Sequence, residues 1–255
     1  RLFGPPNVSP ALPPWAGAGD PSASLRAGAS AIAQRLRAPS VRRELKQYRS
    51  IITALARGDW SRIVLFDCPS QPELARKSIA EISAARAVEP LDAIYDILIE
   101  NADTLHELMI VAFAYREQDI APAFAHPLCM VGSDATALAT DGPLAGTSFH
   151  GAYTWAAWFF RHFARETQML TPQEAIRRIT SLPASRLGLA DRGMIRKGAR
   201  ADLAIFDPAT FAERGTTFEP NQVATGMKHV LVNGVLAVHD GALTGERGGR
   251  VLRRR

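Results

Sequence analysis

Apolar and polar residues alternate along the first half of the chain in a pattern that predicts strands separated by helices. Apolar residues recur at helical spacing over 29–57, 70–85 and 90–100, and a short helix or turn is expected at 116–124. Short uninterrupted apolar runs predict buried strands at 62–66, 108–114 and 128–131. Strands that alternate with helices are typical of βα units in a parallel sheet. The pattern alone does not distinguish an open sheet from part of a barrel.

The second half begins with helices. An aromatic-rich helix is predicted at 153–166, and its aromatic residues have the spacing of a core-facing stripe. The next helix has a clear start signal, because Thr171 can cap it, Pro172 suits its first position and Glu174 can complete a capping box. We expect an interruption of this helix at Pro183.

The chain becomes rich in strand signals after residue 188. Two β-rich segments follow, and Asn233-Gly234 inside an apolar run predicts a tight hairpin. We therefore place a domain boundary near residue 188. Residues 1–187 form the larger domain, with an inserted helical and loop region near 1–60, and residues 188–255 form a small β unit.

The composition is that of a folded protein without membrane spans. Hydrophobic residues make up 47% of the 255 residues, enough for a sizeable core, and no apolar run approaches the roughly 20 residues that span a bilayer. The two cysteines, Cys68 and Cys129, are expected to be buried thiols in a cytoplasmic protein. The chain begins at Arg1 rather than Met, and we expect a processed or truncated N-terminus.

The net charge of +5 raises the question of nucleic-acid binding. The arginines are spread along the chain, however, and no basic run is interleaved with aromatic residues. The cluster near the C-terminus is typical of a solvated tail. A basic binding module is therefore the least favoured interpretation, and we expect neither a nucleic-acid nor a membrane partner.

Asp134 is the main candidate for chemistry. It follows the predicted strand 128–131 and a Gly-Ser pair, and the carboxyl ends of strands form the active-site face of parallel α/β folds. An aspartate there can bind a metal ion or move a proton. From the residues alone, an aspartate after a strand is more often a helix cap.

Several stretches together resemble the C-terminal part of the amidohydrolase superfamily, and most of all its N-acyl-D-amino-acid deacylase (D-aminoacylase) branch. The resemblance rests on the segments LPPWA, GSDATALATDGPLAG, FHGAYTWAAWFFRHFARE, LTPQEAIRRITSLPASRLGLADRGMIRKGARADLAIFDPATF and HVLVNGVLAVHDGALTGERGGRVL. It covers most of the chain and is weakest over about residues 20–80.

The resemblance implies an α/β fold, namely the C-terminal part of a (β/α)8 metal-dependent hydrolase barrel plus a small β-sandwich segment. It implies a zinc-dependent hydrolase of non-peptide C–N bonds, with an N-acyl-D-amino acid or related amide as substrate. Asp134 would act as the proton shuttle and could also be a metal ligand. His150 and Ser133 are weaker candidates for substrate binding, and the other histidines are given turn, packing or surface roles.

The family's His-x-His metal motif is absent from the sequence. We therefore expect one or two zinc ions whose other ligands lie outside this chain, and a chain that is inactive alone. The missing N-terminal half would be supplied in cis or as a separate chain. Two alternatives stay open: a non-catalytic partner chain of a two-chain hydrolase, and another amidohydrolase such as a cyclic-amide hydrolase. The chain could also form a homo-oligomer.

Overall fold

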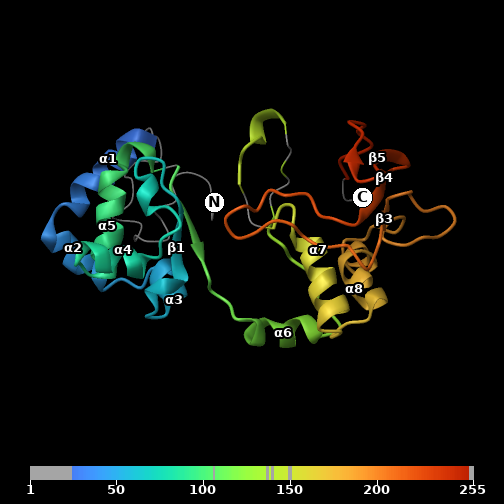
Figure 1. Ribbon diagram of the computed structural model, residues 1–255, viewed down its shortest axis with the longest axis horizontal. Helices are drawn as coiled ribbons and strands as arrows, with labels where there is room; N and C mark the ends of the chain where they lie inside the picture. Colours follow the sequence, from blue (N-terminus) through green and yellow to red (C-terminus); the bar gives the residue numbers. More distant parts are fainter. Residues whose placement is uncertain (1–24, 106, 136–137, 139–140, 149–150, 253–255) are drawn as a thin grey trace. The chain divides into compact units, whose positions relative to one another are not determined.

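The chain folds into two compact units, residues 1–116 and 117–255, each described here by itself. The structure is a computed structural model that describes residues 25–105, 107–135, 138, 141–148 and 151–252 (Figure 1). The expected loop at 1–24 with its Leu12–Trp15 turn, as well as His106 and His150, lies outside the described residues. The predicted division near residue 188 stays a prediction, and the β-rich segment after it belongs to the second unit.

Unit 1 is mainly helical. Its elements are α1 (Leu25–Leu36), α2 (Pro39–Lys46), α3 (Ile51–Ala56), η2 (Trp60–Arg62), β1 (Ile63–Asp67), η3 (Pro72–Leu74), α4 (Ile79–Arg86), α5 (Pro90–Glu100), η4 (Ala102–Thr104) and β2 (Met109–Ala112). Helix α4 begins with a complete capping box between Ser78 and Glu81. Ile63 and Leu65 of β1 and Tyr95 of α5 are almost fully buried and belong to one hydrophobic core.

The strands of unit 1 correct the expectation of a parallel sheet. Strand β1 pairs with β2 in the antiparallel direction, with Ile63 opposite Ala112. In a parallel pair, a single crossover helix brings the chain back to the end at which the first strand began. Here two helices, α4 and α5, lie between β1 and β2 in the sequence. The chain therefore enters β2 in the opposite direction. Apolar runs predict which segments are extended, but not the direction in which they pair.

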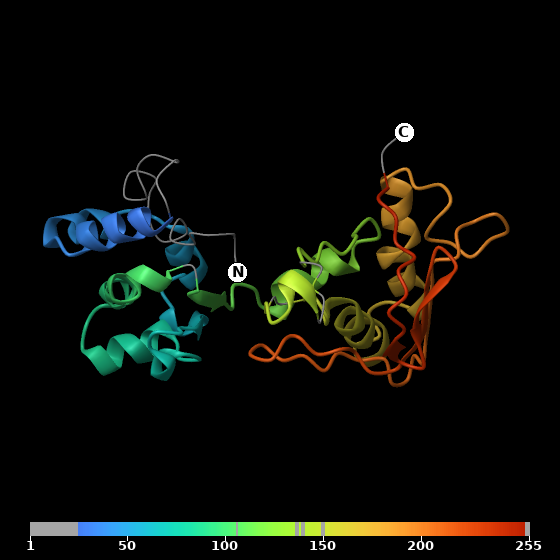
Figure 2. The same cartoon turned by 90° about the horizontal axis from the view of Figure 1, so that it is seen from above.

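Unit 2 combines helices with a four-stranded sheet. Its elements are α6 (Glu117–Ala125), η5 (Gly142–Leu144), α7 (Trp155–Phe160), the π-helical η6 (Arg161–Glu166), α8 (Pro172–Ile179), α9 (Ser181–Arg186), β3 (Leu203–Phe206), β4 (Met227–Val232), β5 (Val235–His239) and β6 (Ala242–Leu243). The sheet is antiparallel in the order β3-β4-β5-β6. Figure 2 shows unit 2 from a second direction.

Local signals in this unit are confirmed. Asn233 and Gly234 both have positive φ, as a tight hairpin turn between β4 and β5 requires. The hydroxyl of Thr171 caps α8 by accepting a hydrogen bond from the Glu174 amide at 3.2 Å. Pro183 explains why α8 ends at Ile179, because its ring excludes the carbonyl four residues earlier from a continuous helix.

The predicted strand at 128–131 is wrong. The chain turns there instead, with the Cys129 amide bonded to the His126 carbonyl, and Leu128 is 60% exposed. A strand needs a neighbour to pair its backbone groups, and no described residue pairs with this segment in a sheet. Cys68 is buried as expected, whereas Cys129 is only half-buried.

An aromatic cluster forms the core of unit 2. Phe159, Phe160 and Phe163 are each at most 3% exposed. Phe124 of α6 lies 4.8 Å from Phe163, between ring centroids. Phe211, in the β-rich segment, lies 6.0 Å from Phe160, also between ring centroids. The same helix face thus holds both α6 and the β-rich segment.

Replacing Phe163 with alanine should lower the free energy of unfolding of unit 2 by about 3–5 kcal/mol, because it removes a buried ring and leaves a cavity. Urea unfolding followed by tryptophan fluorescence measures this, since Trp158 lies 5.4 Å from Phe163. Val251→Ala is the control, because Val251 is 86% exposed and should change little. Equal stability of the two variants would contradict this description of the core.

Candidate active site

Asp134 lies in a loop outside the helices and strands, with its side chain exposed to solvent. Its φ of 49° is in the left-handed region, where aspartate is one of the few non-glycine residues found often. The Ser133 hydroxyl accepts a hydrogen bond from the Ala135 amide at 3.3 Å and stabilises the turn. The amides of residues 136 and 137, from which a capping Asp134 would accept, lie outside the described residues, so the helix-cap role stays a prediction.

A second loop passes beside this turn. Gly151 has a φ of 84°, and a side-chain carbon at this position would lie 3.8 Å from Cβ of Ala135 and 3.9 Å from the carbonyl oxygen of Ser133. His150, the residue before Gly151, is outside the described residues, so its predicted role stays a prediction. The hydroxyl of Ser133, the residue before Asp134, is already bonded to the Ala135 amide.

The described residues do not form a metal site by themselves. Among them, no group of three or more His, Cys, Asp or Glu side chains is placed to hold an ion. His126 accepts from the Leu128 amide at 3.3 Å, which fits the predicted turn role. His229 and His239 lie on β4 and β5, as predicted.

Comparison with known proteins decides the family. The profile described as "Amidohydrolase family" matches residues 77–238, well over half of the chain. The chain belongs to this family. An N-acyl-D-glutamate deacylase of Alcaligenes xylosoxydans xylosoxydans is 34% identical over 185 residues, which are 72% of this chain and 34% of the relative. A D-aminoacylase of the same organism is 30% identical over 76% of this chain and 37% of the relative.

Solved structures agree with this amidohydrolase assignment. A D-aminoacylase structure whose title describes a binuclear metal center gives a TM-score of 0.63 at 30% identity, over 79% of this chain and 39% of that chain. An N-acyl-D-glutamate deacylase from Bordetella bronchiseptica, complexed with zinc and a phosphonate inhibitor, gives 0.54 at 29% identity over 74% and 38%. The chain spans about a third of the length of the relatives it matches.

Polar residues from the segments that resemble the amidohydrolase family hold the β-rich segment together. Arg192 pairs with the Asp202 carboxylate and donates to the Asn233 side chain at 2.6 Å. The backbone N–H of Asn233 donates to the Asp202 carboxylate at 2.7 Å. Asp207 accepts from the Ala209 amide at 2.9 Å. Asp202 and Asp207 thus have hydrogen-bonding roles that hold loops of the β-rich segment.

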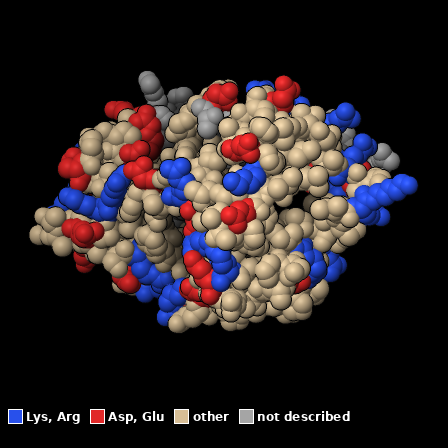
Figure 3. All heavy atoms as spheres, turned by 45° about the vertical axis from the view of Figure 1, so that its right-hand side comes forward, with Lys and Arg blue, Asp and Glu red and all other residues tan. Residues whose placement is uncertain are grey.

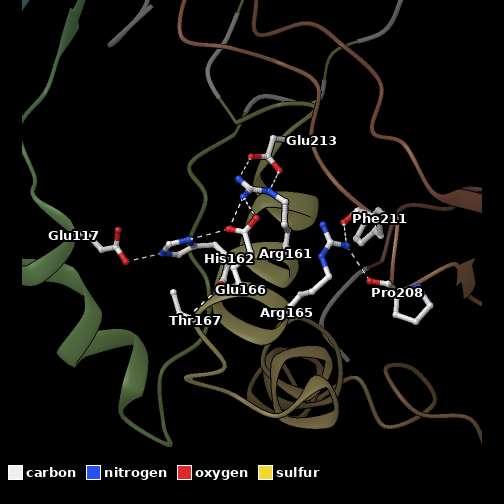
Figure 4. A network of polar contacts seen from close by, with 9 residues as sticks. All are labelled: Glu117, Arg161, His162, Arg165, Glu166, Thr167, Pro208, Phe211 and Glu213. Atoms are coloured by element: carbon white, nitrogen blue, oxygen red, sulfur yellow. Dashed lines mark hydrogen bonds and ion pairs between the residues drawn. The ribbon is translucent and has the colours of Figure 1, made fainter.

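A polar network joins the aromatic helix to neighbouring segments (Figure 4). Arg161 donates to both Glu213 and Glu166, and the hydrogen bond with Glu213 is the main reason why the pKa of Arg161 is raised. His162 stacks on Trp158 and lies 2.7 Å from Glu117 at the start of α6. His162 is thus more than the surface or core filler that its helical spacing suggested.

Glu174 does not use its carboxylate for the capping box. It instead accepts from Arg177 at 2.7 Å and from Arg178 at 2.7 Å. These two hydrogen bonds lower the pKa of Glu174 to about 2. Sequence analysis missed this cluster, although an acid three and four residues before two arginines on a helix is a detectable signal.

Unit 2 should therefore lose stability in acid through Glu174. A carboxyl whose pKa is lower in the folded state stabilises the fold above its unfolded pKa, here 4.5, and loses that contribution as the pH falls toward 2. Between these values, the melting temperature of the wild type should fall more steeply than that of Glu174→Gln. Thermal unfolding at a series of pH values measures this. Glu246→Gln, at an exposed position, should keep the wild-type slope, and an identical slope for Glu174→Gln would contradict the prediction.

Proposed function

We propose that this chain is the part of a zinc-dependent N-acyl-D-amino-acid deacylase that carries the proton-transferring aspartate, Asp134. The observation that supports this most is the set of relatives, whose names are N-acyl-D-glutamate deacylase, D-aminoacylase and N-acyl-D-aspartate deacylase, at 30–34% identity. The three names share an acyl group on the nitrogen of a D-amino acid. The proposed substrate class is therefore an N-acyl-D-amino acid.

The proposed chemistry of Asp134 is proton transfer during amide cleavage. A bound zinc ion lowers the pKa of a water molecule toward neutrality. The Asp134 carboxylate would take a proton from the attacking water and give it to the leaving amine nitrogen. Its exposure to solvent supports this role, because the carboxylate can reach a substrate. Ser133 and His150 are proposed to contact the substrate beside it.

The proposed fold of the whole enzyme is a (β/α)8 barrel with a small β-sandwich, of which this chain supplies the C-terminal part. The antiparallel sheet β3-β4-β5-β6 is the proposed contribution to the sandwich. The zinc ligands are proposed to lie largely outside this chain, in the same polypeptide or in a partner chain. A partner-chain arrangement gives a distinct result below.

Asp134→Asn in the enzyme that contains this chain should lower turnover of N-acetyl-D-glutamate by about 10²–10⁴-fold, because asparagine cannot carry the proton. Zinc content should stay close to that of the wild type. Release of the free amino acid measures turnover, and elemental analysis measures zinc. Asp240→Asn is the matched control, since Asp240 is also exposed and has a φ of 47°. Wild-type turnover by Asp134→Asn would sink the assignment.

Removal of metal by a chelator should abolish hydrolysis, and added zinc should restore it. The L-enantiomer of the same substrate should be a poor substrate.

The isolated 255-residue chain should bind no stoichiometric zinc, because the described residues hold no group of three ligands. Stoichiometric zinc on the isolated chain would contradict the proposal that the ligands lie elsewhere, whereas activity restored only by a second polypeptide would identify the two-chain arrangement.

The charge distribution gives no support to the binding-module alternative. On the face shown in Figure 3, basic and acidic side chains are interspersed. Among the described residues, no helix is long and apolar enough to cross a bilayer. Several arginines are instead bonded to acids or carbonyls of the chain itself, as Arg161 and Arg178 illustrate.

A further inference from the structure

The segment that leads to Asp134 is held at its start by side chains of α8. Helix α6 ends at Ala125, and the turn of Asp134 follows nine residues later. The last carbonyl groups of a helix have no partner within the helix itself. Here the carbonyls of Phe124 and Ala125 accept hydrogen bonds from Arg178, the latter at 3.3 Å.

Arg178 is the most deeply buried charged residue among those that the structure describes, at 3% exposure. A buried guanidinium is stable only when it is paired and hydrogen-bonded. Its Nε donates to Glu174 at 2.7 Å, while its two terminal nitrogens donate to the carbonyls at the end of α6. The planar fork of arginine allows all three contacts at once.

Arg177 holds a third carbonyl group, and we call Arg177 and Arg178 together the clamp. Its Nη2 donates to the Pro127 carbonyl at 3.0 Å, and its Nε donates to Glu174. One carboxylate therefore orients both arginines, and the arginines hold three carbonyl groups between residues 124 and 127. Farther along, Val131 packs against the aromatic cluster, so only residues 132 and 133 separate the last anchor from Asp134.

We propose that Arg178 is a positioning residue for Asp134, acting through the end of α6; this role rests on the proposed function of Asp134. The side chains of Leu128 and Met130 are exposed and give the intervening chain little support. Without Arg178, the carbonyls of residues 124 and 125 lose their partners and the segment 126–135 gains freedom. Misplacement of a reacting group by about 1 Å can cost on the order of 100-fold in rate.

The test compares Arg178→Met with Arg165→Met in the enzyme that contains this chain. Arg165 is a matched control, because it also donates to two carbonyls, those of Pro208 and Phe211, both at 2.9 Å (Figure 4). We expect hydrogen–deuterium exchange in peptides covering 124–135 to be faster in Arg178→Met and unchanged in Arg165→Met. We expect kcat to fall about 10–100-fold only in Arg178→Met, with KM and zinc content unchanged.

The two readouts separate the possible failures. Unchanged exchange in 124–135 would overturn the clamp whatever the activity. Faster exchange with wild-type kcat would overturn the positioning role, provided that Asp134→Asn is inactive. An active Asp134→Asn enzyme would instead mean that the proposed function has failed, and exchange would still decide the clamp. Arg178→Lys serves if the methionine variant does not fold, because it keeps the charge but cannot reach all three acceptors, and the same pattern of exchange and kcat is then required.

Discussion

Burial of one aromatic helix face is the constraint on which unit 2 depends. Phe159, Phe160 and Phe163 leave almost no surface to solvent, and their neighbours come from distant parts of the chain. Phe124 brings α6 to this face, and Phe211 brings the β-rich segment. Tilted and edge-on ring contacts add directional preference to the general gain from apolar burial. The helix face therefore holds two segments that are far apart in the sequence.

Backbone groups near these contacts have to be satisfied, and arginine is the repeated solution. A planar guanidinium with five donors can bridge neighbouring carbonyl groups where no secondary structure continues. Among the described residues, three arginines each bridge two carbonyls in this way: Arg62 with Phe113 and Ala114, Arg165 with Pro208 and Phe211, and Arg178 with Phe124 and Ala125. This internal use explains how a basic chain can lack a basic run suited to nucleic acid.

The sequence predicts those features that short-range chemistry decides. The Asn233-Gly234 turn and the Thr171 cap depend on a few neighbouring residues, and both are confirmed. The direction of the β1–β2 pair and the absence of a strand at 128–131 depend on which distant segments are available as partners. A period-2 or apolar-run signal carries no information on that choice. The errors in the strand predictions therefore lie in pairing, while most helices are placed correctly.

The same distinction applies to the candidate site. The family of the chain and the choice of Asp134 come from a long signature, whereas the left-handed turn of Asp134 and its support by α8 require the three-dimensional contacts. Glu174 shows why: its sequence position fits a capping box, yet its carboxylate bonds two nearby guanidinium groups, whose full positive charge makes them stronger partners than a backbone amide. The carboxylate takes the stronger partners, and those partners reach the end of α6. A residue that seemed to start one helix thus fixes the end of another, and through it the approach of the chain to Asp134.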